Sequence, residues 1–207
     1  LNNPTSTAVH TDALNIIFAH CRENGIKVLV DETYVEFAKD YEHTTSASLV
    51  EKYDNIMIAR GVSKFFAAPG LRLGYGLCSN ASILDTVRTT KTPWGINSFA
   101  AISAPMFNDK TYISLTQSLI HTEQNLVYSA LCSRKTIKVY KPEANFVLIK
   151  LLKEDLTASA VFTYCIKKGI MIRDCSDFTG LGDKYIRMCF LNPEDNDNAV
   201  NSILEIV

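Results

Sequence analysis

Short apolar segments that alternate with a helical segment constrain the fold of the first half of this chain more than any other feature. Residues 26–30 and 55–60 are apolar runs of strand length, each followed by polar residues. Before them, residues 8–23 repeat apolar side chains at the i, i+3, i+4 and i+7 positions from Leu14. Residues 71–78 then alternate large apolar residues with arginine and glycine. This pattern predicts an α/β fold, with helices on both faces of a mostly parallel sheet.

The second half of the chain predicts a different layout, a small α+β domain. We expect a long helical stretch over residues 98–133, broken near Pro105. Strands and helices then follow over residues 145–151, 156–168, 170–174, 185–191 and from 193 to the last turn. Asn192 is a good N-cap for the last helix. We place the domain boundary after residue 104, so that 1–104 and 105–207 form two domains.

Charge and composition exclude several classes of protein. The 207 residues carry 21 basic and 22 acidic side chains, a net charge of −1, without the basic stretch typical of nucleic-acid or membrane-surface binding. No apolar run approaches the roughly 20 residues that cross a bilayer. The six cysteines form no C-x-x-C pair, and the four histidines show no ligand spacing. We therefore expect a cytoplasmic protein without metal, nucleic-acid or membrane binding.

Polar residues of complementary chemistry follow the predicted strands and turns. They are Asn3, Asp31 with Tyr34, Lys64 and Arg72. Loops after separate strands of an α/β sheet converge at the carboxyl ends of those strands. An amide, a carboxylate, a phenol, an amine and a guanidinium together would suit a small aromatic cofactor that carries a phosphate.

Four motifs in the same order connect the chain to a known family. The segments NNPTS, VLVDETYVEF, SKFFAAPGLRLGY and GIMIRDCSDFTGL with the later IRM resemble the class I/II aminotransferases, enzymes of fold type I that use pyridoxal 5′-phosphate. The chain most resembles the branch of histidinol-phosphate aminotransferases and threonine-phosphate decarboxylases. The resemblance implies the C-terminal half of the large cofactor-binding domain plus a small domain. It also implies a homodimer that acts on a small amino donor and a 2-oxo acid acceptor.

The resemblance assigns the two central roles to Lys64 and Asp31. In the family this lysine forms a Schiff base with the cofactor aldehyde, and the released amine can act as a general base. A desolvated site would keep that amine neutral. Asp31 would keep the ring nitrogen protonated. The alternatives are a solvated loop lysine and an N-cap aspartate.

The same resemblance assigns the remaining cofactor contacts. Tyr34 and Asn3 match the residues that hydrogen-bond the phenolic oxygen of the cofactor. Ser63 and Arg72 match the ligands of its phosphate, because a hydroxyl and a guanidinium fork suit that group. Taken alone, these residues could also be a half-buried tyrosine, a turn asparagine and a solubilising arginine on an exposed strand.

Two arginines in the second half match substrate ligands. Arg187 corresponds to the arginine that binds the substrate carboxylate, and Arg173 to a position that binds a substrate phosphate. The alternative is that these arginines pair at the surface with Asp174, Asp177 or Asp183.

The chain departs from the family pattern in two respects. Ser6 stands where the family turn usually has glycine, and a serine would be strained there if the position needs a positive φ. The family also has a further segment ahead of this turn, so we expect this chain to be the C-terminal portion of a longer enzyme.

The motifs leave the reaction open. Transamination is the first hypothesis, and decarboxylation of the threonine-phosphate type is the second. A third hypothesis is a non-catalytic domain that senses pyridoxal phosphate and reports to a DNA-binding module.

Overall fold

The computed structural model describes residues 1–207, and its internal contacts divide the chain into two units. The first unit comprises Leu1 and Ala8–Ser114, and the second comprises Asn2–Thr7 and Leu115–Val207. Both units combine helices with a sheet, which confirms the predicted α/β class. The domain boundary expected after residue 104 stays a prediction. None of the helices combines the length and apolar character that crossing a membrane requires.

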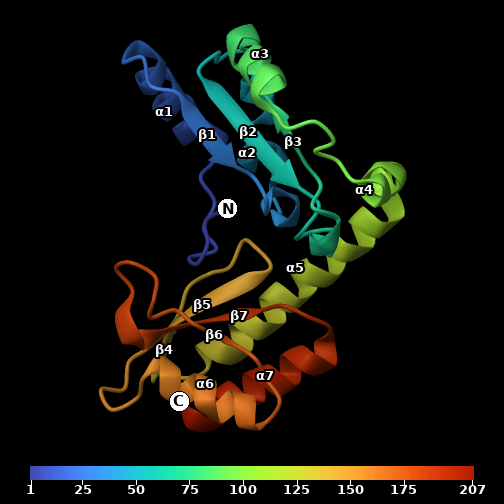
Figure 1. Cartoon of the computed structure of the whole chain (residues 1–207). Helices are drawn as coiled ribbons and strands as arrows, with labels where there is room; N and C mark the ends of the chain where they lie inside the picture. The colour runs from blue at the N-terminus through green and yellow to red at the C-terminus, as the bar shows by residue number, and fades with distance from the viewer. The chain divides into compact units, whose positions relative to one another are not determined.

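A three-stranded sheet in the order β1-β2-β3 forms the centre of the first unit (Figure 1). Its strands are β1 (Val28–Asp31), β2 (Ile56–Gly61) and β3 (Gly74–Leu77). β1 and β2 run parallel, with Asp31 opposite Ala59, whereas β3 is antiparallel to β2. The helices are α1 (Thr11–Glu23), α2 (Tyr41–Thr44), α3 (Ala81–Thr90), α4 (Ser98–Ser103) and the beginning of α5 (Lys110–Cys132).

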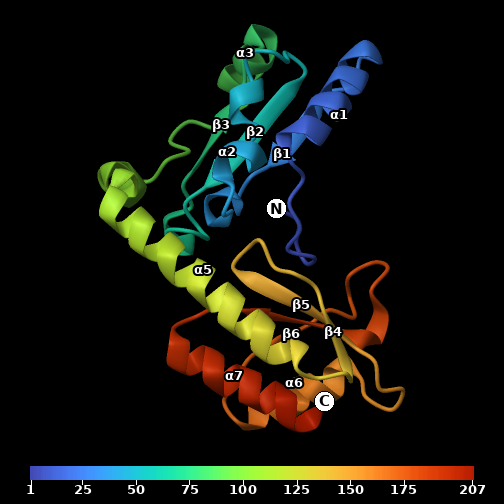
Figure 2. The same ribbon diagram turned by 180° about the vertical axis from the view of Figure 1, so that it is seen from behind.

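Helix α1 packs its apolar side against β1 and β2. Phe18 forms a buried cluster with Leu49, Tyr53 and Ile56. The Phe18 and Tyr53 rings meet edge to face, with centroids 5.8 Å apart. Both views of the ribbon show α1 beside β1 (Figures 1 and 2). This core fixes the two parallel strands against each other.

The second unit is built on a four-stranded antiparallel sheet in the order β4-β5-β7-β6. Its strands are β4 (Ile137–Val139), β5 (Phe146–Leu151), β6 (Arg173–Asp174) and β7 (Tyr185–Cys189). Helices α6 (Ala158–Lys167) and α7 (Pro193–Ile206) complete this unit with most of α5. Val147, Ile149 and Met188 share one face of the sheet and are at most 2% exposed. Arg187 points to the other face.

Most of the predicted elements are confirmed. The expected break near Pro105 is a 3-10 turn (Ala104–Asn108) between α4 and α5. Helix α7 begins at Pro193, and the Asn192 side chain accepts the Asp195 amide at 2.9 Å. The sequence reasoning missed α3 and β4. It also began β3 too early, because a 3-10 turn (Pro69–Leu71) precedes that strand.

Candidate functional site

Three of the predicted cofactor residues of the first unit line one cavity. Asp31, Ser63 and Arg72 surround a space of about 240 Å³ at the carboxyl ends of β1 and β2. Thr33 and Arg60 also line this cavity. The parallel pairing explains the convergence, because Asp31 ends β1 while Ser63 follows β2 by two residues. A carboxylate, a hydroxyl and a guanidinium therefore face a common space.

Asp31 is held in a local turn with an exposed carboxylate. Its Oδ1 accepts the backbone amide of Thr33 at 2.9 Å and also the Thr33 hydroxyl. The alternative that Asp31 caps a following helix is wrong, because the next helical turn begins at Val35 with Tyr34 before it. These contacts fix one carboxylate oxygen and leave the other for a partner.

Lys64 and Tyr34 lie next to each other. The Lys64 Nζ is 5.7 Å from the centroid of the Tyr34 ring, within the range of a cation–π contact. Lys64 is exposed in this chain, whereas the neighbouring Phe65 is 2% exposed. Phe65 therefore enters the core while Lys64 does not, and the described residues do not form the desolvated surroundings expected for its amine.

Arg72 is placed by backbone conformation and is not on a strand, contrary to our expectation. Its φ of 52° lies in the left-handed region, and its Nη1 donates to the Pro69 carbonyl at 3.3 Å. β3 then starts at Gly74, where a Cβ would come within 2.7 Å of the Arg60 carbonyl. The absence of a side chain at Gly74 thus lets the neighbouring strands β2 and β3 approach each other closely.

A buried ion pair, which the sequence reasoning missed, joins the strand ends beside this cavity. Glu32 Oε2 lies 2.7 Å from Arg60 Nη2 and 3.0 Å from Arg60 Nε, and both side chains are more than nine-tenths buried. Arg60 also donates to the Tyr41 hydroxyl at 2.9 Å and to the Thr45 hydroxyl at 2.5 Å. Burial alone would lower the pKa of Arg60, but hydrogen bonds to Tyr75 and Glu32 outweigh it and raise that pKa.

In the second unit, Arg187 and Asn3 contact each other directly. The Asn3 Oδ1 accepts a hydrogen bond from Arg187 Nη1. The Arg187 guanidinium also lies over the Phe146 ring, 4.9 Å from its centroid. Its Nε is buried without a hydrogen-bond partner. No carboxylate pairs with Arg187 here, which leaves donors of the guanidinium for an anion.

Arg173 lies opposite Arg187 on the neighbouring strand, and both line a cavity of about 670 Å³. Its Nη2 is 2.5 Å from Asp177 Oδ2, in an exposed ion pair. The surface pairing that we considered as an alternative is therefore present for Arg173, although it does not exclude a ligand. Exposed pairs of this kind contribute little to stability, so a stronger anion could replace Asp177.

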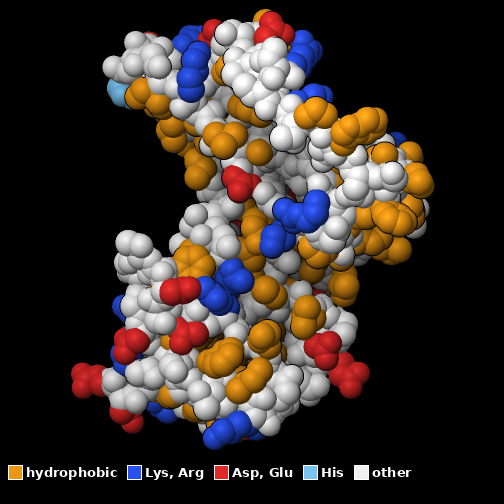
Figure 3. Space-filling model, in the orientation of Figure 1, with side chains coloured by type: hydrophobic (Ala, Val, Ile, Leu, Met, Phe, Trp, Pro, Cys, Tyr) orange, Lys and Arg blue, Asp and Glu red, His pale blue; other side chains and the backbone are white.

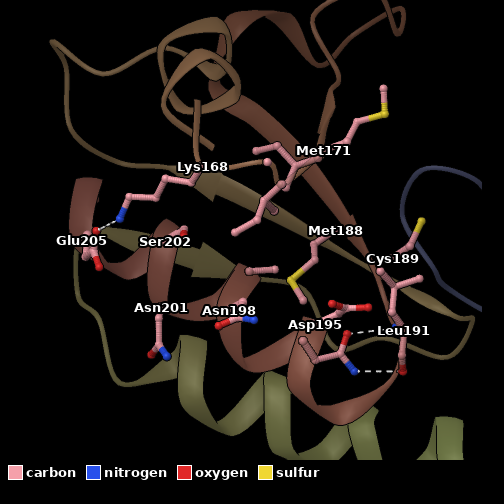
Figure 4. Close-up of a pocket in the computed structure, with 15 residues that line it drawn as sticks. Lys168, Met171, Met188, Cys189, Leu191, Asp195, Asn198, Asn201, Ser202 and Glu205 are labelled. Carbon is pink, nitrogen blue, oxygen red and sulfur yellow. Dashed lines mark hydrogen bonds and ion pairs between the residues drawn. The ribbon is translucent and has the colours of Figure 1, made fainter. Parts of the chain in front are cut away.

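A larger hollow of about 910 Å³ lies between α7 and the segment that leads into β6 (Figure 4). None of the predicted site residues lines it. Lys168 and Glu205, which form an exposed ion pair, are among the residues that line it. The Asn196 side chain forms two hydrogen bonds with the backbone of Leu191. We assign it no role in the candidate site.

The residues of the first unit fit pyridoxal phosphate by their chemistry. The cavity offers an oxygen of Asp31 for a protonated ring nitrogen, and a hydroxyl and a guanidinium for a phosphate. Lys64 and Tyr34 directly follow two of the residues that line it.

Comparisons with known proteins agree with these observations. The family model "Aminotransferase class I and II" matches residues 1–203. A histidinol-phosphate aminotransferase of Methanosphaera stadtmanae is 31% identical over the whole chain and 54% of its own length. A threonine-phosphate decarboxylase of Salmonella typhimurium is 26% identical over the whole chain and 56% of its own length. This chain thus spans about half the length of these relatives.

A solved structure shows the same fold. The histidinol-phosphate aminotransferase from Clostridium acetobutylicum superimposes with a TM-score of 0.93 at 28% identity, over 99% of this chain and 61% of its own. The resemblance inferred from the four motifs is confirmed by these matches.

The buried ion pair predicts a specific loss of stability. We expect Glu32→Gln to cost about 3–5 kcal/mol of unfolding free energy, because it leaves the Arg60 charge buried without a carboxylate. The double variant Glu32→Gln/Arg60→Met should recover most of this loss, since it removes both charges. Urea denaturation of the purified protein measures both effects. Glu42→Gln, an exposed carboxylate of α2, is the matched control and should change little. A Glu32→Gln protein as stable as the wild type would contradict the assignment.

Proposed function

Because the chain belongs to the class I and II aminotransferase family, we propose that it forms part of an enzyme that transfers an amino group between an amino compound and a 2-oxo acid. Pyridoxal 5′-phosphate is the cofactor of this family, and a solved structure of similar fold holds it bound. When bound, the cofactor supplies an aldehyde that links to amines and a ring that accepts electrons from the substrate carbon. The observation that carries the proposal is the cavity shared by Asp31, Ser63 and Arg72.

In this proposal the first unit holds and orients the cofactor. The Asp31 carboxylate would keep a proton on the ring nitrogen, and the two bonds from Thr33 keep that carboxylate in place. Ser63 and Arg72 would donate to the phosphate. The phenol of Tyr34 would donate to the phenolic oxygen of the ring, from a position next to Lys64.

Lys64 would carry out the covalent and proton-transfer roles. Its Nζ would hold the cofactor covalently through the aldehyde when no substrate is bound. The free amine would act as the general base that accepts the proton from the substrate Cα. The Lys64 amine must be unprotonated for both roles, because only then is its lone pair free.

The second unit would bind the substrate through its arginines. Arg187 would bind a carboxylate with its free donors, while Asn3 and Phe146 hold the guanidinium in one orientation. Arg173 would bind a substrate phosphate, as the names of the relatives indicate for their own substrates. In that case the phosphate would displace Asp177 from Arg173.

We also propose that the enzyme is a homodimer. Large apolar side chains are gathered on the surface over α4 (Figure 3), and the exposed ones are Trp94, Ile96, Phe99, Ile102 and Met106. A patch of this kind marks an interaction surface, and a second copy is the occupant we propose. We also propose that the protein is cytoplasmic, a compartment that keeps thiols reduced. All six cysteines are free.

The dimer proposal predicts a mass of two subunits for the full-length protein in light scattering. The variant Phe99→Asp should shift that mass toward one subunit, because it introduces a charge into the apolar patch. A wild-type mass of one subunit at micromolar concentration would contradict the proposal.

The role of Lys64 predicts a covalent adduct. Borohydride treatment of the full-length protein with pyridoxal phosphate should fix the cofactor on Lys64, and peptide mass spectrometry locates it. Lys64→Ala should lose the visible colour and lower turnover by at least about a thousandfold, because both roles of the amine are gone. Lys91→Ala, which changes another exposed lysine of the first unit, is the control. Turnover that survives Lys64→Ala, or an adduct at another lysine, would refute the assignment.

Decarboxylation of an amino-acid phosphate is the second candidate, because a threonine-phosphate decarboxylase is among the relatives. The two reactions release different products from threonine phosphate. Incubation of the full-length enzyme with this compound and a 2-oxo acid should give an amino acid from the 2-oxo acid and little carbon dioxide. Stoichiometric carbon dioxide would exclude transamination as the main activity and favour the decarboxylase.

A further inference from the structure

Ser6 combines a left-handed backbone with complete burial. Its φ is 61°, a value that favours glycine, and its exposed fraction is 0%. The family turn usually has glycine at this position, which raises the question of what the side chain contributes here.

The hydroxyl of Ser6 accepts two backbone amides from a distant segment. The amide of Ala144 donates to Ser6 Oγ at 2.8 Å, and the amide of Glu143 donates to it at 3.1 Å. The Glu143 amide also reaches the Ser6 carbonyl, at 3.0 Å. Glycine could keep only the carbonyl contact. The buried amide of Ala144 would then lose its acceptor.

These hydrogen bonds complete a closed chain of contacts that includes Arg187. Residues 143–144 lead directly into β5, which starts at Phe146, and the Phe146 ring lies under the Arg187 guanidinium. Arg187 in turn donates to Asn3, in the same turn as Ser6. Within that turn, the Ser6 amide donates to the Asn2 carbonyl at 2.8 Å. All of these residues belong to the second unit.

We propose that Ser6 is a positioning residue for the anion-binding guanidinium of Arg187. Its hydroxyl fastens the turn of residues 2–7 to residues 143–144, and this sets the distance between the Asn3 amide and the Phe146 ring that hold Arg187. The inference rests on the proposed function, in which Arg187 binds the substrate carboxylate. The two hydrogen bonds that the hydroxyl accepts offset the free-energy cost of the positive φ. With glycine at this position, neither amide would have a side-chain acceptor.

Two variants separate the hydroxyl from the backbone strain. Ser6→Ala keeps a Cβ at the positive φ and removes the hydroxyl, whereas Ser6→Gly removes both the hydroxyl and the strain. In the full-length enzyme, both variants should raise the KM for the carboxylate-bearing substrate on the order of tenfold and leave kcat within about twofold, since Lys64 is untouched. The probe is 2-oxoglutarate, as a 2-oxo acid, if the enzyme transaminates, and threonine phosphate if it decarboxylates.

A second readout does not depend on turnover. In protein labelled with ¹⁵N-arginine, the Nε–Hε resonance of Arg187, assigned with Arg187→Lys, should shift or broaden in both Ser6 variants. Thr157→Ala is the matched control, because the Thr157 hydroxyl also accepts a backbone amide in this unit, from Ala160 at 3.2 Å. It should lower the melting temperature without moving either the KM or the Arg187 resonance.

The outcomes are distinguishable. An Arg187 resonance unchanged in both Ser6 variants, or a KM change no larger than that of Thr157→Ala, would overturn the positioning role. The KM and the Arg187 resonance of Ser6→Gly could also match those of the wild type while those of Ser6→Ala do not. Backbone strain would then be the cause, and the proposal is also overturned. A wild-type enzyme that forms no adduct on Lys64 fails the proposed function, whereas the resonance still tests the link from Ser6 to Arg187.

Discussion

The parallel pairing of β1 with β2 is the constraint on which the candidate site depends. It places Asp31 opposite Ala59, so that the loops after both strands open at the same end of the sheet. A shift of one residue would move Asp31 to the other face. The Glu32–Arg60 pair reinforces this register from the buried side, because each partner directly follows one of the paired residues.

Opposite faces of the same strand ends therefore carry different tasks. Asp31 remains exposed toward the cavity, whereas Glu32, the next residue, is buried with its partners Arg60 and Thr45. Successive side chains along a strand point to opposite faces, which is sufficient to separate Asp31 from Glu32. A carboxylate that lines the cavity and a carboxylate in a buried ion pair thus occupy adjacent positions, since neighbouring side chains point to opposite sides.

In the second unit, a turn rather than a pair of strands brings the candidate binding residues together. Arg187 lies 184 positions from Asn3 in the sequence, and Ala144 lies 138 positions from Ser6, yet these residues form one connected set of contacts. The guanidinium of Arg187 is held by an amide and an aromatic ring rather than by a carboxylate. Its charge consequently remains available to an anion, in contrast to that of Arg173, which Asp177 already neutralises in part.

The sequence by itself determined the α/β class, most helices and strands, and the residue types of the candidate site. Periodicity, capping residues and four ordered motifs carry that information locally, as the N-cap at Asn192 illustrates. Only the tertiary structure decided the register of β1 on β2, the burial of Glu32 with Arg60, and the use of the Ser6 hydroxyl. These features depend on residues 28 to 138 positions apart, whose mutual distance no local pattern encodes. The left-handed conformation of Arg72 likewise follows from its place between a 3-10 turn and a strand.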